Sequence, residues 1–224
     1  MLHFGTDGVR GVALEELTTD SVRDLARAVA RVLSPAAVIV GRDTRESGEV
    51  LERAVVDGLA AEGVTVHLLG VAPTPAIAFA SERHGHVAIA LTASHNPWTD
   101  NGVKVFAPGG LKLTDEVERA IEHELSTLGA PESSSTGSVR NDETAASAYV
   151  DHLVAAFPAS MLDRLRVVID CANGSMSVVA PAVFAALGAD VVSLHSGLPI
   201  SVVDLDRARL PFHVEIAATG ASYV

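Results

Sequence analysis

The chain has 224 residues, of which 28 are acidic and 16 basic, so its formal net charge is −12. Its length suits one or two domains, and its 48% content of hydrophobic residues is typical of a folded globular chain. The acidic balance argues against nucleic acid or an anionic membrane as a partner, because both attract basic surfaces. A single cysteine excludes an internal disulfide framework. No apolar run suits a signal peptide or a membrane span, so we expect a cytoplasmic protein.

Helical and strand patterns alternate over residues 1–128, which we expect to form the first domain. Apolar residues recur at helical spacing from Val22 to Leu33, behind Thr18–Asp20, which can cap the start of the helix. Further helices are expected at 51–59, 73–83 and 117–128, and strands at 38–40, 64–69, 87–91 and 103–106. Strands separated by helices predict an α/β fold, here a three-layer α/β/α domain with a mainly parallel mixed sheet.

The second part of the chain repeats this alternation only once. Residues 129–142 form a polar segment without periodicity, which we interpret as a linker. After it we expect helices at 145–157 and 178–187 and strands at 167–170 and 190–194, which is one βαβ unit. Residues 143–195 are therefore predicted to be an incomplete second α/β domain. Its exposed apolar surface would favour self-association.

The last residues, 196–224, lack this alternation and are predicted to be an irregular tail of the kind that truncation or a frameshift would leave. The single cysteine, Cys171, is expected to be a small apolar residue that ends a buried strand.

The segment that follows the apolar run at 87–91 is rich in polar residues, among them Ser94, His95, Asn96 and Lys104. Ligand crevices in α/β sheets form at the carboxyl ends of strands. A hydrolase nucleophile is disfavoured, because adjacent residues of an extended chain point in opposite directions and no Gly-x-Ser-x-Gly motif surrounds Ser94. A phosphorylated Ser94 would find cations and N–H donors here. The alternative is an ordinary surface turn.

Two glycine-rich segments add to the case for a phosphate site. Phe4–Gly11 contains Arg10, and Gly41–Gly48 contains Arg42 and Arg45. Glycines let the backbone approach an anion closely, and arginine contacts phosphate with two parallel hydrogen bonds. The second segment also precedes a predicted helix, whose N-terminus favours anions. Together the three segments favour phosphate binding over three unrelated surface turns.

Phe4–Gly11, Gly41–Gly48 and Thr92–Lys104, with the string Thr-Ala-Ser-His-Asn-Pro, resemble the α-D-phosphohexomutase superfamily. The resemblance runs from residue 3 to about 195 and includes Val168–Gly174. It implies an isomerase in which phosphorylated Ser94 donates its phosphoryl group to a hexose phosphate. The resulting bisphosphate reorients and returns its other phosphate to the serine. The sequences of these motifs most resemble those of the members that act on glucosamine phosphates. The expected pair is therefore glucosamine 6-phosphate and glucosamine 1-phosphate, with mannose or glucose phosphates as alternatives.

The resemblance also assigns roles to individual residues. It implies four catalytic residues: Ser94, Arg10, His95 and Lys104, of which Lys104 is a candidate general acid or base. It implies six residues that support the loops or the phosphate: Thr6, Asp7, Gly8, Arg42, Asn96 and Asn101. The implied cofactors are Mg²⁺, bound through the phosphate on Ser94, and a hexosamine or hexose 1,6-bisphosphate as activator and intermediate.

The chain departs from the superfamily in its length. Members have four domains and are roughly twice as long; the third domain supplies an Asp-Gly-Asp-x-Asp-Arg metal loop and the fourth a phosphate-binding loop. Val202–Arg207 matches only the last part of that metal loop. A truncated, catalytically inactive fragment is therefore the alternative to an active mutase.

Overall fold

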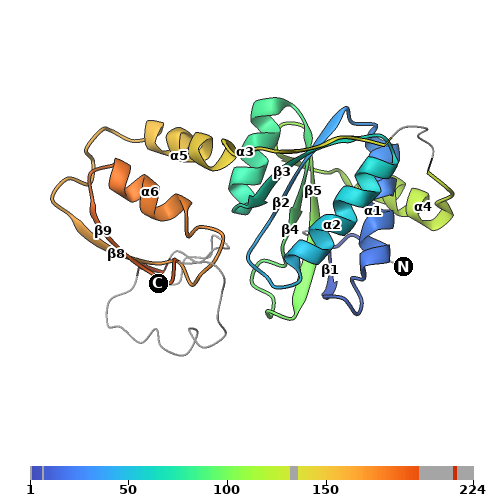
Figure 1. Ribbon diagram of the computed structural model, residues 1–224, viewed down its shortest axis with the longest axis horizontal. Helices are drawn as coiled ribbons and strands as arrows, with labels where there is room; N and C mark the ends of the chain where they lie inside the picture. Colours follow the sequence, from blue (N-terminus) through green and yellow to red (C-terminus); the bar gives the residue numbers. More distant parts are fainter. Residues whose placement is uncertain (1, 7, 132–135, 197–213, 216–224) are drawn as a thin grey trace.

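The computed structural model describes residues 2–6, 8–131, 136–196 and 214–215. Its larger part is a seven-stranded sheet in the order β1-β5-β4-β2-β3-β7, with β6 paired to β5 (Figure 1). The strands are β1 (Val9–Val12), β2 (Ala37–Arg42), β3 (Thr65–Val71), β4 (Val87–Leu91), β5 (Asp100–Ala107), β6 (Leu111–Lys112) and β7 (Val139–Asn141). Neighbours β4, β2, β3 and β7 are parallel, whereas β5 pairs antiparallel with β1, β4 and β6.

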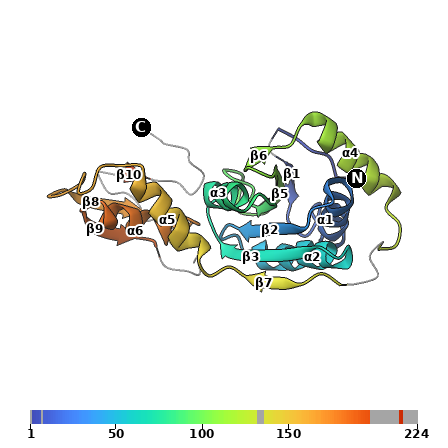
Figure 2. The ribbon, with the colours of Figure 1, turned by 90° about the horizontal axis from the view of Figure 1, so that it is seen from above.

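Helices cover both faces of this sheet, which confirms the predicted three-layer α/β/α architecture (Figures 1 and 2). On one face lie α1 (Thr19–Leu33), α2 (Gly48–Ala61) and α4 (Asp115–Thr127), and on the other lies α3 (Thr74–His84). Strand β4 is wholly buried, and its side chains alternate between the two cores: Val87, Ile89 and Leu91 face α1 and α2, and the two alanines between them face α3.

The helix starts follow from local hydrogen bonding. The Thr18 side chain accepts a hydrogen bond from the Ser21 N–H at the start of α1, as the sequence predicts. Thr114 caps α4 in the same way, through the Val117 N–H. The helix α3 ends at Gly85, whose left-handed backbone is a common helix stop.

The second unit contains α5 (Ala145–Ala155), α6 (Val179–Ala186) and a parallel sheet in the order β10-β8-β9. Its strands are β8 (Arg166–Asp170), β9 (Asp190–Leu194) and β10 (Val214–Glu215), the last of which lies within the stretch predicted to be an irregular tail. It joins the first unit through α5 and α3, where the Phe79 ring lies 5.6 Å from Tyr149 and 4.4 Å from His152, centroid to centroid. Burial in this contact raises the pKa of Tyr149.

Large apolar side chains are exposed on this second unit: Phe157, Met161, Leu165, Val168 and Val178. Such a surface is what the predicted self-association needs, and that association stays a prediction.

Cys171 directly follows β8 in the sequence and is fully buried, and burial raises the pKa of its thiol. None of the helices described has the length and apolar character that crossing a bilayer requires.

The segment expected to be a linker contains β7, which extends the sheet as a parallel partner of β3 (Figure 2). Three mostly polar residues are too few to show a strand period, so only the pairing reveals this strand. It places Arg140 opposite His67, and the rings of His67 and His86 stack at 5.9 Å. Burial lowers the pKa of His67, and His86, Arg140 and His84 lower it further, against a smaller opposing effect of Asp142.

The lowered pKa of His67 should make the folded chain less stable in mild acid. Because the pKa of His67 is lower in the folded than in the unfolded chain, protonation favours unfolding as the pH drops below the ordinary value of 6.5. The substitution His67→Gln should therefore shrink the fall in melting temperature between about pH 7.5 and about pH 5.5. His123, exposed on α4, provides the control variant His123→Gln. An equal fall in both variants would contradict a role for His67.

Candidate active site

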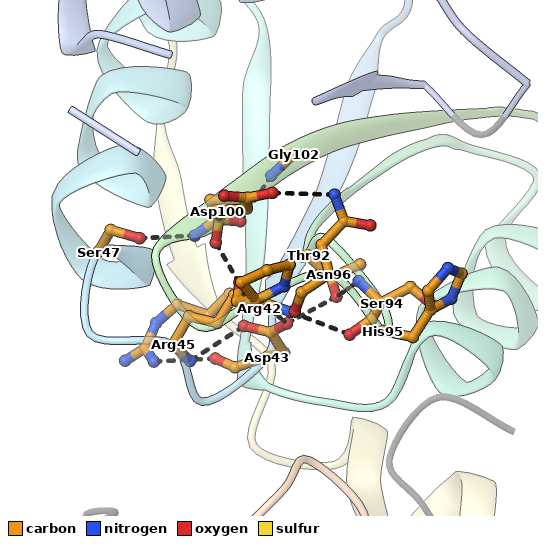
Figure 3. A network of polar contacts seen from close by, with 12 residues as sticks. Arg42, Asp43, Arg45, Ser47, Thr92, Ser94, His95, Asn96, Asp100 and Gly102 are labelled. Atoms are coloured by element: carbon orange, nitrogen blue, oxygen red, sulfur yellow. Dashed lines mark hydrogen bonds and ion pairs between the residues drawn. The ribbon is translucent and has the colours of Figure 1, made fainter. Parts of the chain in front are cut away.

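The polar residues singled out in the sequence meet where β2 and β4 end and β5 begins. The Asp43 N–H donates to the Leu91 carbonyl at 3.0 Å, and the Thr92 N–H donates to the Gly102 carbonyl at 3.0 Å. These bonds bring the loop after β2, residues 43–47, against the loop between β4 and β5, residues 92–99 (Figure 3). The loop that carries Ser94 thus lies at the carboxyl ends of β2 and β4, the edge of the sheet where the sequence predicts a ligand site.

Ser94 has a left-handed backbone with φ +55°. Its N–H donates to Thr92 Oγ1 at 3.0 Å, and the Thr92 hydroxyl donates in turn to Asp43 Oδ2 at 2.6 Å. A β-carbon disfavours this conformation by about 1–2 kcal/mol, so surrounding contacts must hold it. Ser94 is therefore held in place through Thr92 by Asp43, which follows β2, and Ser94 itself remains partly exposed.

Arg45 lies beneath the Ser94 loop, and its side chain is only 11% exposed. Its Nε donates to Asp43 Oδ2 at 3.1 Å, and its two terminal nitrogens donate to four backbone carbonyls (Figure 3). These are the carbonyls of Ser94 (2.9 Å), Asn96 (3.0 Å), Pro97 (2.6 Å) and Asp100 (2.9 Å). One cation thus binds four backbone carbonyls within residues 94–100, the segment called here the 94–100 loop.

Arg10 and Asn96, predicted to lie in one site, are in direct contact. Arg10 Nη1 donates to Asn96 Oδ1 at 3.0 Å, and Asn96 Nδ2 donates to Asp100 Oδ2 at 3.0 Å. Arg10 reaches this position from β1, because β1 pairs with β5 with Arg10 opposite Gly102. The contact places a fixed positive charge two residues from Ser94 along the loop.

His95 lies within this loop, and Lys104 lies on β5 beyond it. His95 is exposed, and its Nδ1 lies 3.5 Å from Ser94 Oγ, at the outer limit of a hydrogen bond. The expectation that the two side chains diverge assumed an extended chain, whereas Ser94 is left-handed. Lys104 lies on β5, and its Nζ is 5.3 Å from the centroid of the Phe106 ring, a cation–π distance.

Arg42 turns away from the Ser94 loop toward α2. Its Nη2 lies 3.1 Å from Glu49 Oε1 and its Nε 3.3 Å from Glu52 Oε2. Burial raises the pKa of Glu52, and the charge of Arg42 opposes that rise.

The remaining predicted support residues are spread over three places. Asn101 is fully buried and joins the loops, because its Nδ2 donates to Ser47 Oγ at 2.9 Å and its Oδ1 accepts from the Gly102 N–H. Gly8 closes a tight turn with Gly5 beside β5, and Thr6 is exposed at the tip of that turn. Asp7 lies outside the described residues, as does Val202–Arg207.

The described residues do not form a Mg²⁺ site by themselves. Among them, no three His, Cys, Asp or Glu side chains are grouped as metal ligands. The carboxylates in the network, Asp43 and Asp100, are occupied by Arg45, Thr92, Thr99 and Asn96. A metal at Ser94 would thus have one described ligand, the phosphate on that serine, and would need the others from elsewhere.

The sequence interpretation missed three residues that shape the loop: Asp43, Thr92 and Ser47. All three lie inside the quoted motifs, yet none was assigned a role. The spacing Asp43-x-Arg45 was a usable signal, because an aspartate side chain commonly bonds the backbone N–H two residues later, and Asp43 Oδ1 accepts from the Arg45 N–H at 3.0 Å.

The sequence of the chain also matches a known protein family. A sequence profile described as "Phosphoglucomutase/phosphomannomutase, alpha/beta/alpha domain I" matches residues 1–131, more than half of the chain. The chain belongs to the phosphoglucomutase/phosphomannomutase family. Its described fold agrees: a solved phosphoglucomutase/phosphomannomutase family protein from Burkholderia thailandensis superposes with a TM-score of 0.74 at 30% identity, over 86% of this chain and 43% of that one.

Curated relatives within the family are named phosphoglucosamine mutase. The relative from Frankia alni is 50% identical over 208 residues, which cover 86% of this chain and 46% of the relative. The relative from Rhodococcus opacus is 48% identical over 203 residues, which cover 86% of this chain and 45% of the relative. The chain therefore spans about half the length of the curated relatives it matches.

Proposed function

We propose that this chain carries the phosphoryl-accepting serine of a phosphoglucosamine mutase, which interconverts glucosamine 6-phosphate and glucosamine 1-phosphate. The observation that carries the proposal is the Ser94 loop. The partly exposed Ser94 is held with a left-handed backbone at the carboxyl ends of the strands, and Arg10 bonds to the same loop. The names of the relatives point to the substrate class.

In the proposed reaction, Ser94 Oγ and a sugar hydroxyl exchange one phosphoryl group. When the enzyme donates, the bond between Ser94 Oγ and phosphorus breaks and Ser94 Oγ takes up a proton, while a bond forms between the sugar oxygen and phosphorus and the sugar hydroxyl gives up its proton. In the return step Ser94 Oγ gives up its proton as it bonds to phosphorus, and the sugar oxygen that loses phosphorus takes one up. His95, within 3.5 Å of Ser94 Oγ, and Lys104 are the proposed proton carriers, and Arg10 offsets the phosphoryl charge.

The proposal includes Mg²⁺, a hexosamine 1,6-bisphosphate and a cytoplasmic location. Members of the family generally use Mg²⁺, and here its further ligands have to come from outside the described residues. One buried, unpaired cysteine in 224 residues suits a reducing compartment.

The test is to incubate the purified chain with glucosamine 1,6-bisphosphate, with Mg²⁺ or with EDTA, and to measure its intact mass. We expect one added phosphoryl group on Ser94, found by peptide mapping, and none in Ser94→Ala. Ser126→Ala, which removes an exposed hydroxyl on α4, should accept the group normally. No uptake by the wild-type chain, or equal uptake by Ser94→Ala, would contradict the proposal.

The same sample tests whether this chain is sufficient for the full reaction. Interconversion of the two glucosamine phosphates would show that the chain acts alone. Phosphoryl uptake without interconversion would assign it the serine-bearing half-reaction. Glucose and mannose 1,6-bisphosphates, offered in parallel, measure the preference for the amino sugar.

A further inference from the structure

We propose that Arg45 is a positioning residue, whose guanidinium holds the 94–100 loop in the conformation that presents Ser94 Oγ to a phosphoryl group. The proposal rests on the proposed function for its effect on phosphoryl transfer, whereas its effect on the loop can be measured without any reaction. It reverses the role that the sequence suggests for this arginine, which is direct contact with phosphate.

The hydrogen bonds of Arg45 leave it no donor for a substrate. A guanidinium has five N–H groups. Arg45 directs Nε to Asp43, Nη1 to the carbonyls of Pro97 and Asp100, and Nη2 to those of Ser94 and Asn96. All five donors are thus used inside the protein, and the carboxylate of Asp43 balances the charge. Arg45 therefore acts on the reaction through the loop backbone.

The same bonds explain how Ser94 keeps an unfavourable backbone. Its carbonyl accepts from Arg45 and its N–H donates to Thr92, so both of its peptide groups are held. Asp43 ties these two supports together, because its Oδ2 accepts from both Arg45 and Thr92. Without the guanidinium, the four carbonyls would separate and Ser94 could relax to an ordinary conformation.

Lysine cannot replace Arg45 here. An ammonium is a compact charge with three donors, whereas the four carbonyls and the carboxylate are arranged around a planar fork. Arg45→Lys therefore keeps the charge and loses the geometry, and Arg45→Ala loses both. Arg53, exposed on α2, provides the matched control Arg53→Ala.

The chain contains its own probe of this loop. Trp98 is the only tryptophan of the sequence, is 65% exposed, and follows Pro97, whose carbonyl Arg45 binds. The fluorescence anisotropy of Trp98 should fall in Arg45→Ala and, less, in Arg45→Lys, and stay unchanged in Arg53→Ala. Amide exchange of Ser94 and Asn96 should quicken in the same order. Unchanged anisotropy and exchange in a folded Arg45→Ala or Arg45→Lys chain would overturn the proposal.

Phosphoryl uptake separates positioning from phosphate binding. In Arg45→Ala, the maximal rate of Ser94 phosphorylation by glucosamine 1,6-bisphosphate should fall about a hundredfold, as for a misplacement of about 1 Å, with little change in the half-saturating concentration. Guanidinium ion below denaturing concentration should restore part of the rate, and ammonium should not. A loss confined to the half-saturating concentration would overturn the proposal. If the wild-type chain takes up no phosphoryl group, the proposed function fails, and the Trp98 and amide-exchange measurements still decide the role of Arg45.

Discussion

Replacing Gly58 by alanine should lower the free energy of unfolding by about 2 kcal/mol. Gly58 lies where α2 crosses α1, and an added β-carbon would sit 2.3 Å from the Arg23 carbonyl oxygen and 3.0 Å from Ala26 Cβ. Overpacking typically costs about 1–3 kcal/mol, and the upper end applies because a carbonyl cannot turn aside as a side chain can. The higher helix propensity of alanine offsets about 1 kcal/mol of that loss.

Thermal unfolding followed by circular dichroism measures this effect. For a chain of this size, about 2 kcal/mol corresponds to a fall of about 4–8 °C in melting temperature. Asp57→Ala, at the exposed position just before Gly58, changes helix propensity without creating a contact between α1 and α2. Equal melting temperatures of the Gly58→Ala and Asp57→Ala chains would show that the two helices can separate freely at this crossing.

Much of the fold could be predicted from local patterns in the sequence. Strand β4 is buried on both faces and appears as an unbroken apolar run, and α1 carries both a threonine cap and an apolar stripe. Strands β1, β6 and β7 were not predicted. They have between two and four residues, and only their partners, β5 and β3, define them as strands. Such pairing depends on residues distant in sequence and leaves no local period.

The site was predictable to a different degree. The motif around Ser94 predicts a phosphorylated serine, a role that stays a prediction. In the structure Arg10 contacts Asn96 and Arg45 contacts the Ser94 carbonyl, so the three distant motifs do meet. What the sequence could not predict is which arginine of Gly41–Gly48 serves the loop. Arg42 pairs with Glu49 and Glu52 on α2, while Arg45 lies beneath Ser94. Side-chain direction at the end of a strand decides this, and two arginines three residues apart look alike in sequence.

Replacing Gly8 by alanine should cost the chain about 3 kcal/mol of stability and impair phosphoryl uptake as well. Gly8 has φ +95°, a backbone that residues with a β-carbon rarely adopt, at a cost of about 1–2 kcal/mol. The added β-carbon would also sit 2.4 Å from the Val103 carbonyl oxygen and 3.0 Å from Lys104 Cα, which adds about 1–3 kcal/mol. The clash is with the backbone of β5, so relief requires the 5–8 turn to move away from Lys104.

That movement would reach the site through β1, because Arg10 follows Gly8 by two residues and bonds to Asn96 in the Ser94 loop. Gly129→Ala is the matched control, since a β-carbon there meets nothing within 4 Å. Chemical denaturation should show the loss of stability in Gly8→Ala alone, and the rate of Ser94 phosphorylation, measured well below the melting temperature, should fall with it. A destabilised Gly8→Ala chain that still takes up phosphoryl groups at the wild-type rate would show that the turn supports the fold and not Arg10.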